Sequence, residues 1–169
     1  AYDFEYYLAE CLFYVGDYED AASAYTHVRD SQQNNKHQEP ASLSAVISLE
    51  KAIAQAEKSG QLSTPALRTA SERKGGPVAP SELSPLHKNL VSASDAYAAS
   101  FASSERAPAV RYNAAELFYR HDQLDEARQR FESIVSDYPS TEVARYASNL
   151  IIESYLANED YAKVEEWSE

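Results

Sequence analysis

The chain has 169 residues, of which 44% are hydrophobic, and its formal net charge is −12. This length and composition fit one folded domain or a short array of repeats, and no run approaches the ~18 apolar residues of a membrane-spanning helix. The negative charge disfavours nucleic acid and anionic membrane surfaces, so we expect a protein or peptide partner that is basic or neutral.

The chain begins on alanine inside a predicted helix and contains no methionine. Its first ten residues, AYDFEYYLAE, lack the basic start and apolar run of a signal peptide. We therefore expect a processed product or a fragment of a longer chain. Cys11 is the only cysteine, so no internal disulfide can form. Its position within a helix favours a buried core residue over a reactive thiol.

Two short amphipathic helices are predicted in residues 7–28, YLAECLFYVGDYEDAASAYTHV, on either side of a Gly-Asp turn. Asp17 precedes the second helix, where its side chain can cap free backbone N–H groups. The apolar positions of the second helix recur at intervals of three and four residues, at Tyr18, Ala21, Ala22, Tyr25 and Val28.

The middle of the chain differs in composition, because residues 31–94 contain no aromatic residue and carry a net charge of +2. We predict helices over 41–59, ended by Gly60, and over 82–102, with Pro85 in the first turn. The expected core face of the first is formed by Leu43, Val46, Ile47, Ile53 and Ala54. Residues 61–80 between them contain three prolines and a Gly-Gly pair, which predicts a mobile loop that proteases cut first.

The last third is again strongly periodic, and we see no alternating strand pattern of useful length. Asp122 precedes one predicted helix as a capping residue, and Pro108 lies near the start of another. Pro139 ends a helix, after which Ser140 or Thr141 can cap the next. The apolar positions are Leu124, Ala127, Phe131, Ile134 and Val135, followed by Val143, Ala144, Ala147, Leu150, Ile151 and Tyr155.

Three segments align without gaps, beginning at Tyr7, Asn113 and Leu150. A single helical hairpin cannot bury its apolar face alone, whereas stacked hairpins share one continuous core. We therefore predict an all-α, right-handed solenoid in a single domain, with Leu12, Phe118 and Tyr155 in equivalent environments. The predicted repeats are 1–31, a divergent 32–104 with a long loop at 60–81, 105–140 and a partial 141–169.

These segments resemble the tetratricopeptide repeat, whose pattern has a small residue in the first helix, Gly-Asp-aromatic at the turn, then an alanine, an aromatic and a closing proline. The matching residues are Ala9, Gly16, Asp17, Tyr18, Ala21 and Tyr25, then Ala115, Leu124, Ala127, Phe131 and Pro139. The third copy keeps Asp160 and Tyr161 but has Val164 in place of the alanine. The long period and the YPST junction resemble the bacterial envelope members of the family, including outer-membrane assembly lipoproteins and the periplasmic coordinator of the Tol–Pal system.

The resemblance implies a non-catalytic interaction scaffold, with the first helix of each repeat lining a concave groove. The family's usual contact positions correspond to Tyr6, Glu10, Phe13, Tyr112, Glu116, Tyr119, Arg120, Tyr146, Asn149 and Glu153. Three of these are carboxylates in register and flanked by tyrosines, which suits a peptide that carries Lys or Arg beside apolar anchors. The resemblance also favours the periplasm or cell envelope over the cytoplasm.

Two other functions fit the same pattern. The array is a segment of a longer structural solenoid that stacks on further repeats of its own chain, with Trp167 as a filler between repeats; or it is a regulatory module fused to an enzyme. We expect no catalytic, cofactor or metal site. His121-Asp122 fits a polar turn, the four histidines lack the spacing of a metal site, and KGGP at 74–77 lacks the pattern of a phosphate-binding loop.

Overall fold

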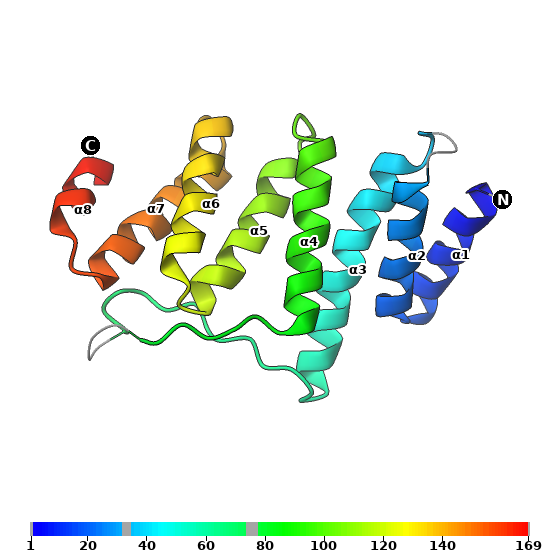
Figure 1. Ribbon diagram of the computed structural model, residues 1–169, viewed down its shortest axis with the longest axis horizontal. Coiled ribbons are helices and arrows are strands. Elements are labelled where there is room, and N and C mark those ends of the chain that lie inside the picture. The colour runs from blue at the N-terminus through cyan, green and yellow to red at the C-terminus, as the bar shows by residue number, and fades with distance from the viewer. Residues whose placement is uncertain (1, 32–34, 74–77, 169) are drawn as a thin grey trace. The chain divides into compact units, whose positions relative to one another are not determined.

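The computed structural model describes residues 2–31, 35–73 and 78–168, and across these ranges it contains eight α-helices and no β-strand (Figure 1). The predicted all-α class of helix-turn-helix repeats is confirmed. The helices are α1 (Tyr2–Val15), α2 (Tyr18–Asp30), α3 (Gln38–Lys58), α4 (Pro85–Ser100), α5 (Ala107–Arg120), α6 (Leu124–Asp137), α7 (Glu142–Ala157) and α8 (Tyr161–Ser168). Lys74–Pro77, considered above for phosphate binding, lie outside the described residues.

The helices form two compact units, each built from neighbours in the sequence. Unit 1 comprises the residues up to Ser63 together with Ser84–Ala107, and unit 2 comprises Thr64–Leu83 and Pro108–Glu169. In unit 1, α2 packs between α1 and α3, and α3 also packs against α4. In unit 2, α7 packs between α6 and α8. The predicted boundaries of the individual repeats stay a prediction.

The core of unit 1 is built from small residues at the helix crossings and aromatic rings in the gaps. Ala9, Ala21, Ala41 and Ala45 are fully buried around Tyr25, which lets the backbones approach closely. Leu12 packs at the edge of this cluster. The prediction for Cys11 is wrong, because the thiol is exposed.

The predicted core face of α3 is partly wrong. Val46 and Ile53 are buried, but Ile47 and Ala54 are exposed, and Ser42 and Ser48 are buried in their place. Helix α3 contacts α2 on one side and α4 on another, so its buried face is wider than one apolar stripe and includes small polar residues. Ser48 meets its hydrogen-bonding requirement locally, since its Oγ donates to the carbonyl oxygen of Ser44 at 2.7 Å.

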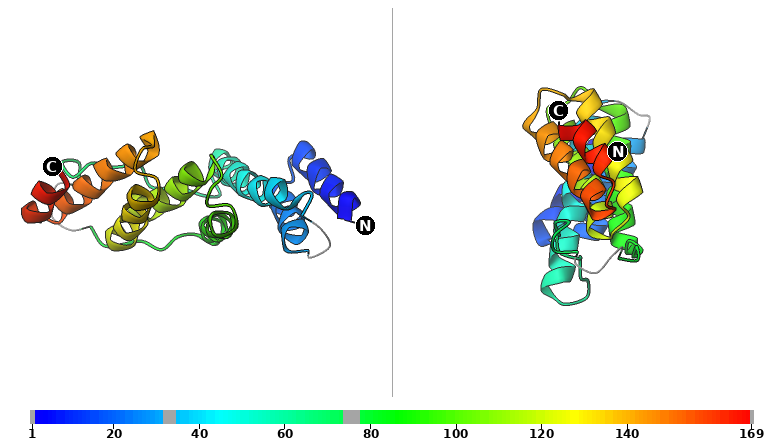
Figure 2. Two further views of the ribbon diagram at one scale, coloured as in Figure 1. Left: turned by 90° about the horizontal axis from the view of Figure 1, so that it is seen from above. Right: turned by 90° about the vertical axis from the view of Figure 1, so that its left-hand side faces the viewer.

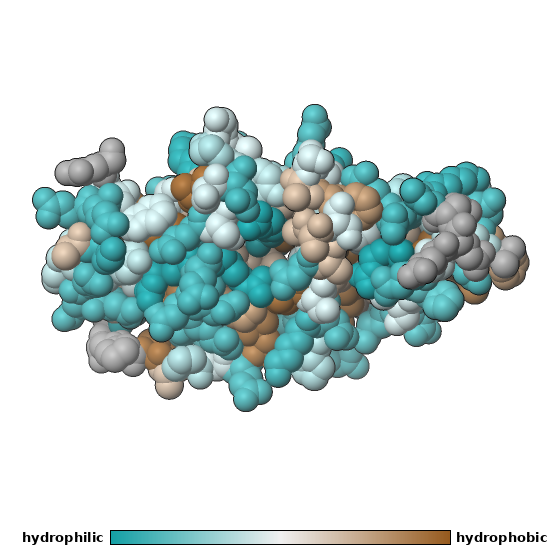
Figure 3. Space-filling model, turned by 45° about the horizontal axis from the view of Figure 1, so that its top comes forward, coloured by the Kyte–Doolittle hydropathy of each residue, from teal (hydrophilic) through white to brown (hydrophobic). Residues whose placement is uncertain are grey.

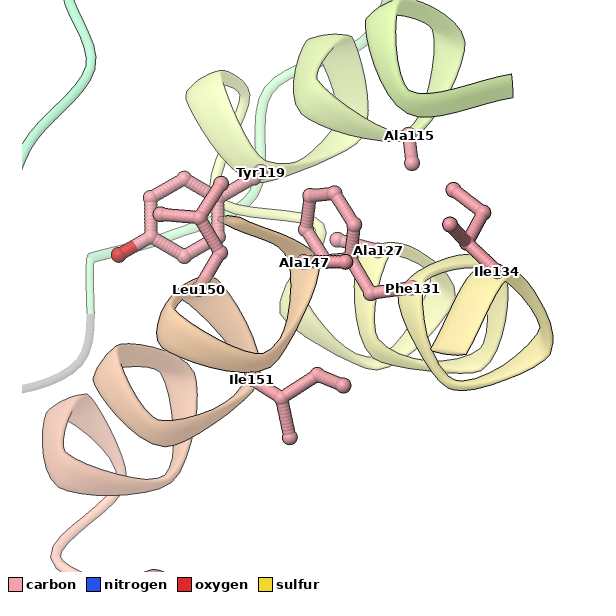
Figure 4. Close-up of a cluster of buried hydrophobic side chains, with 8 residues drawn as sticks. All are labelled: Ala115, Tyr119, Ala127, Phe131, Ile134, Ala147, Leu150 and Ile151. Carbon is pink, nitrogen blue, oxygen red and sulfur yellow. The ribbon is translucent and has the colours of Figure 1, made fainter. Parts of the chain in front are cut away.

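The core of unit 2 follows the same plan, and Figure 4 shows its buried side chains. Phe131 and Ile134 of α6 are fully buried with Tyr119 of α5 and Ile151 of α7. Phe118 and Tyr155 pack at the edge of this cluster, as Leu12 does in unit 1, so the three equivalent residues have related environments. Trp167 is partly buried and packs against the same cluster. The complete set of buried residues is Ala115, Tyr119, Ala127, Phe131, Ile134, Ala147, Leu150 and Ile151.

The turns inside the hairpins share an unusual backbone conformation. Gly16, Asp122 and Glu159 occupy equivalent positions in the aligned segments, and their φ angles are 88°, 59° and 58°. This left-handed conformation costs little for glycine and more for Asp or Glu. Common geometry at these three positions supports the alignment independently of the apolar pattern.

The predicted helix starts at Pro85 and after Pro139 are found in the structure, whereas the two predicted aspartate caps are not. Thr141 accepts a hydrogen bond from the N–H of Ala144 at 3.1 Å, and Ser84 caps α4, which begins at Pro85. Asp17 makes no side-chain capping bond. The capping prediction for Asp122 is wrong, because Gln123 is the N-cap residue of α6 and the Asp122 side chain binds arginines instead.

Hydrophilic residues cover most of the face in Figure 3, with hydrophobic residues visible between them. Among the helices in the described ranges, none combines the length and the apolar character that a membrane span requires.

Candidate partner-binding site

The connecting stretch Thr64–Leu83 belongs to unit 2. Its described residues, 64–73 and 78–83, run along the ends of α5 and α6 toward α7 (Figures 1 and 2). We call residues 64–73 the strap. The sequence predicted a mobile loop here. In the structure Arg73 is 8% exposed, whereas Ala66, Leu67, Thr69, Ser71 and Glu72 are exposed. A turn between Thr69 and Arg73 shapes the strap, because Glu72 accepts hydrogen bonds from both the N–H and the hydroxyl of Thr69 at 2.8 and 2.9 Å.

Asp122 anchors the strap by binding two of its arginines. Arg68 Nη2 donates to Asp122 Oδ2 at 2.5 Å, and Arg73 pairs with the other carboxylate oxygen. The side chains of Arg73 and Asp122 are only 5% and 8% exposed. The guanidinium of Arg73 also lies over the ring of Tyr119, 4.7 Å from its centroid. A buried carboxylate is costly unless it is paired and hydrogen-bonded, and two guanidinium groups offset that cost.

The predicted contact residues of α5 and α7 hold the strap by its main chain. The Tyr119 hydroxyl donates to the carbonyl oxygen of Arg68 at 3.0 Å, and Arg120 Nη1 donates to that of Pro65 at 3.3 Å. Glu153 of α7 accepts the N–H of Ala70 at 2.6 Å. Donors and acceptors are therefore arranged to bind peptide groups of a non-helical segment. The structure brings these three residues together around the main chain of the strap.

A second contact fixes the far end of the connecting stretch. The N–H of Ser81 donates to the carbonyl oxygen of His121 at 2.9 Å, and the Ser81 hydroxyl lies 2.9 Å from His121 Nδ1. Gln123 Nε2 donates to the carbonyl oxygen of Ser81 at 2.7 Å. Burial lowers the pKa of His121 below its ordinary value. His121-Asp122 is thus a polar turn, as expected, and both of its side chains bind the connecting stretch.

The other predicted residues of unit 2 do not bind the strap directly. Glu116 pairs with Arg120 across one helical turn at 2.7 Å and so orients it. Burial, followed by the nearby Glu116 carboxylate, raises the pKa of Tyr112. The Tyr146 hydroxyl donates to Glu142 at 2.8 Å, and Asn149 is exposed.

In unit 1 the predicted contact residues are used in internal packing. The Tyr25 hydroxyl donates to Glu10 Oε1 at 2.5 Å, and burial together with this bond raises the pKa of Tyr25. The Tyr6 ring stacks on His37 with 4.2 Å between centroids, and Phe13 packs edge-on against Tyr18. The described residues of unit 1 show no segment lying over these positions as the strap lies over α5.

A pocket of about 470 Å³ adjoins the strap anchor. It is lined by the turn before α6, the first turn of α6, Val78 and Pro80 of the connecting stretch, and Ala157 and Asn158 at the end of α7. Its acids are already paired: Asp122 with the strap arginines, Asp125 with Arg128, and Glu126 with Arg130. Within the described ranges, no group of three or more His, Cys, Asp or Glu residues is placed to hold a metal ion. The pocket therefore offers no free charge for a small ligand.

Sequence reasoning missed Asp122, Arg68 and Arg73 as a unit. The available signal was weak: two arginines five residues apart in a stretch that otherwise reads as a loop, and an aspartate at a turn position where the first copy has glycine.

The model of the tetratricopeptide repeat family matches residues 109–141, a segment that includes most of α5 and all of α6. No curated protein matches the chain. Similar solved structures include the putative kinesin light chain nearly identical TPR-like repeats of Podosopora anserina and a single-substitution variant of the same repeats. Each is 14% identical, covers 98% of this chain and 90% of its own, and has a TM-score of 0.38.

Proposed function

We propose that the protein is a non-catalytic scaffold that binds a non-helical segment of a partner protein on the strap site, the surface of unit 2 formed by Tyr119, Arg120 and Glu153. Tetratricopeptide repeats generally mediate protein–protein interactions, and residues 109–141 match the model of that family. The observation that carries the proposal is that this surface already holds a peptide by its main chain, through the contacts to Pro65, Arg68 and Ala70 described above.

The geometry defines the chemistry of a suitable partner. Glu153 needs a peptide N–H, and Tyr119 and Arg120 need carbonyl oxygens, so the partner backbone must be accessible rather than folded into a helix. Asp122 additionally selects a guanidinium or ammonium group nearby. We therefore infer a basic partner segment of the Arg-x4-Arg kind, which must displace the strap in order to bind.

The direct test uses a peptide with the strap sequence, TPALRTASER, added to the whole protein and to a variant in which residues 65–73 are replaced by Gly and Ser at equal length. Backbone NMR shifts report binding. The peptide should bind the variant with a Kd of about 0.1–1 mM and wild type at least ~10-fold more weakly, because a tethered strap competes at millimolar effective concentration.

Matched substitutions in the strap-free variant locate the site. Glu153→Ala removes the acceptor and Tyr119→Phe removes the donor, and each should weaken the peptide ~5-fold or more, as expected for loss of one hydrogen bond. Glu142→Ala, on the same helix but without contact to the strap, should leave the affinity unchanged. Absence of peptide binding in a strap-free variant with native circular dichroism would refute the proposal.

The cellular setting is also a proposal. The Tyr138–Thr141 junction and the 37-residue spacing of the last two copies support a place in a bacterial envelope complex, in the periplasm. In-cell cross-linking from the strap site should then capture envelope proteins, and capture of only cytoplasmic proteins would contradict this setting while leaving the binding site itself intact.

A further inference from the structure

Helix α1 exposes a continuous apolar face on the side away from its own core. Phe4, Leu8 and Val15 are 72%, 48% and 72% exposed, and Cys11 is exposed between them. These four residues recur at intervals of four, three and four, which places them along one side of a helix. Tyr7 and Tyr14, which are 58% and 83% exposed, lie along one edge of this side. We call these six residues the α1 face.

Unit 2 shows what covers the same face in another copy of the repeat. In the alignment Phe4, Leu8 and Cys11 correspond to Ala147, Ile151 and Ser154 of α7, and all three of these are fully buried or nearly so. Helix α6 packs against α7 there: Ala147 and Ile151 share a cluster with Phe131 and Ile134, and Arg128 of α6 lies 3.4 Å from the Ser154 hydroxyl. The equivalent side of α7 is thus covered by an amphipathic helix.

The charge around the α1 face selects among the possible occupants. Helix α1 contains Asp3, Glu5 and Glu10 and no lysine or arginine. Lys36 and His37 pair with Asp3 at 3.0 and 2.6 Å, so the acidic character of this helix comes mainly from Glu5 and Glu10. Helical periodicity places Asp3 and Glu10 beside one edge of the face and Glu5 beside the other. Two copies of this face would bring like charges together, and anionic lipid would be repelled. We propose that the α1 face docks an amphipathic helix of a partner protein, with an aliphatic stripe flanked by lysine or arginine.

This surface is separate from the strap site, and its test does not depend on the proposed function. Cys11 lies within the face and is the only cysteine of the chain, so the rate of its modification by a maleimide reports coverage directly. The probe is a synthetic helix of about 18 residues with leucines at three- and four-residue spacing and lysines elsewhere. The matched control peptide carries glutamate in place of every lysine.

Saturating lysine peptide should slow the modification of Cys11 at least ~10-fold, and the glutamate peptide should not. Phe4→Glu and Leu8→Glu should each weaken the protection ~10-fold or more, because burial of such side chains supplies most of the affinity. Tyr161→Glu, at an exposed aromatic residue of α8, is the control and should have no effect. Circular dichroism verifies that each variant is folded, and Phe4→Ala provides a milder second test.

Three outcomes would overturn the inference. Equal protection by both peptides would show that charge does not select the occupant. A concentration-dependent dimer in sedimentation that Phe4→Glu abolishes would identify a second copy as the occupant. Slow modification of Cys11 in the protein without any peptide would mean that its own chain already covers the face.

Discussion

Asp122→Asn tests the strap anchor most directly, because asparagine tolerates the left-handed backbone at this position and removes only the charge. The Arg73 and Asp122 side chains are 5% and 8% exposed, so the substitution leaves a buried guanidinium without its carboxylate. Removing one partner of a buried ion pair costs about 3–5 kcal/mol. The cost should lie at the lower end here, because the Arg68 side chain is 34% exposed and water can hydrate its guanidinium after the substitution. We expect a loss of about 3 kcal/mol in the free energy of unfolding, measured by urea titration.

The control is Asp125→Asn, three residues further on. Asp125 pairs with Arg128, but its side chain is 86% exposed, so a change below about 1 kcal/mol is expected. Adding Arg73→Met to Asp122→Asn removes the other buried charge and should restore much of the lost stability, since the largest penalty comes from leaving one buried charge unpaired. A loss below about 1 kcal/mol for Asp122→Asn would refute the view that this anchor holds the strap.

Two further predictions concern the core and the pH dependence of unit 2. Phe131→Ala should lower the free energy of unfolding by about 3–5 kcal/mol in the same titration, since the ring is fully buried. Because the pKa of His121 is lowered in the folded state, the unfolded state binds more protons below pH about 6.5. The contribution of His121 to the free energy of unfolding is therefore complete above that pH and decreases as the pH falls toward the folded-state pKa. His121→Gln should therefore reduce the change of the urea midpoint between about pH 7 and pH 5. A variant whose midpoint depends on pH as strongly as that of wild type would contradict this.

The helices were predictable because their signals are local. Small residues such as Ala9 and Ala115 and aromatic residues such as Tyr25 and Phe131 recur with helical spacing, and their burial follows from that spacing. Pro85 and Thr141 fixed two helix starts for equally local reasons.

The errors arose where a residue's role depends on distant partners. Cys11 and Ser154 occupy equivalent positions in the aligned repeats, but no described helix covers this side of α1 as α6 covers that of α7. Proline and glycine content showed that residues 61–80 cannot form a helix, but it does not report whether a loop can pack. The strap packs because Arg68 meets Asp122 across 54 positions of the sequence, and no local pattern encodes that distance.

The identity of the turn residue explains why the first repeat has no equivalent of the strap anchor. All three equivalent turns require the left-handed conformation, which glycine supplies at no steric cost at Gly16, whereas an Asp costs roughly 1 kcal/mol there. A side chain at this position projects from the end of a hairpin, where a neighbouring segment can reach it. The Asp122 side chain binds Arg68 and Arg73 there, and those two contacts outweigh the cost of the left-handed backbone conformation. Gly16 has no side chain to offer, so the first turn meets the same backbone requirement without being able to hold a strap.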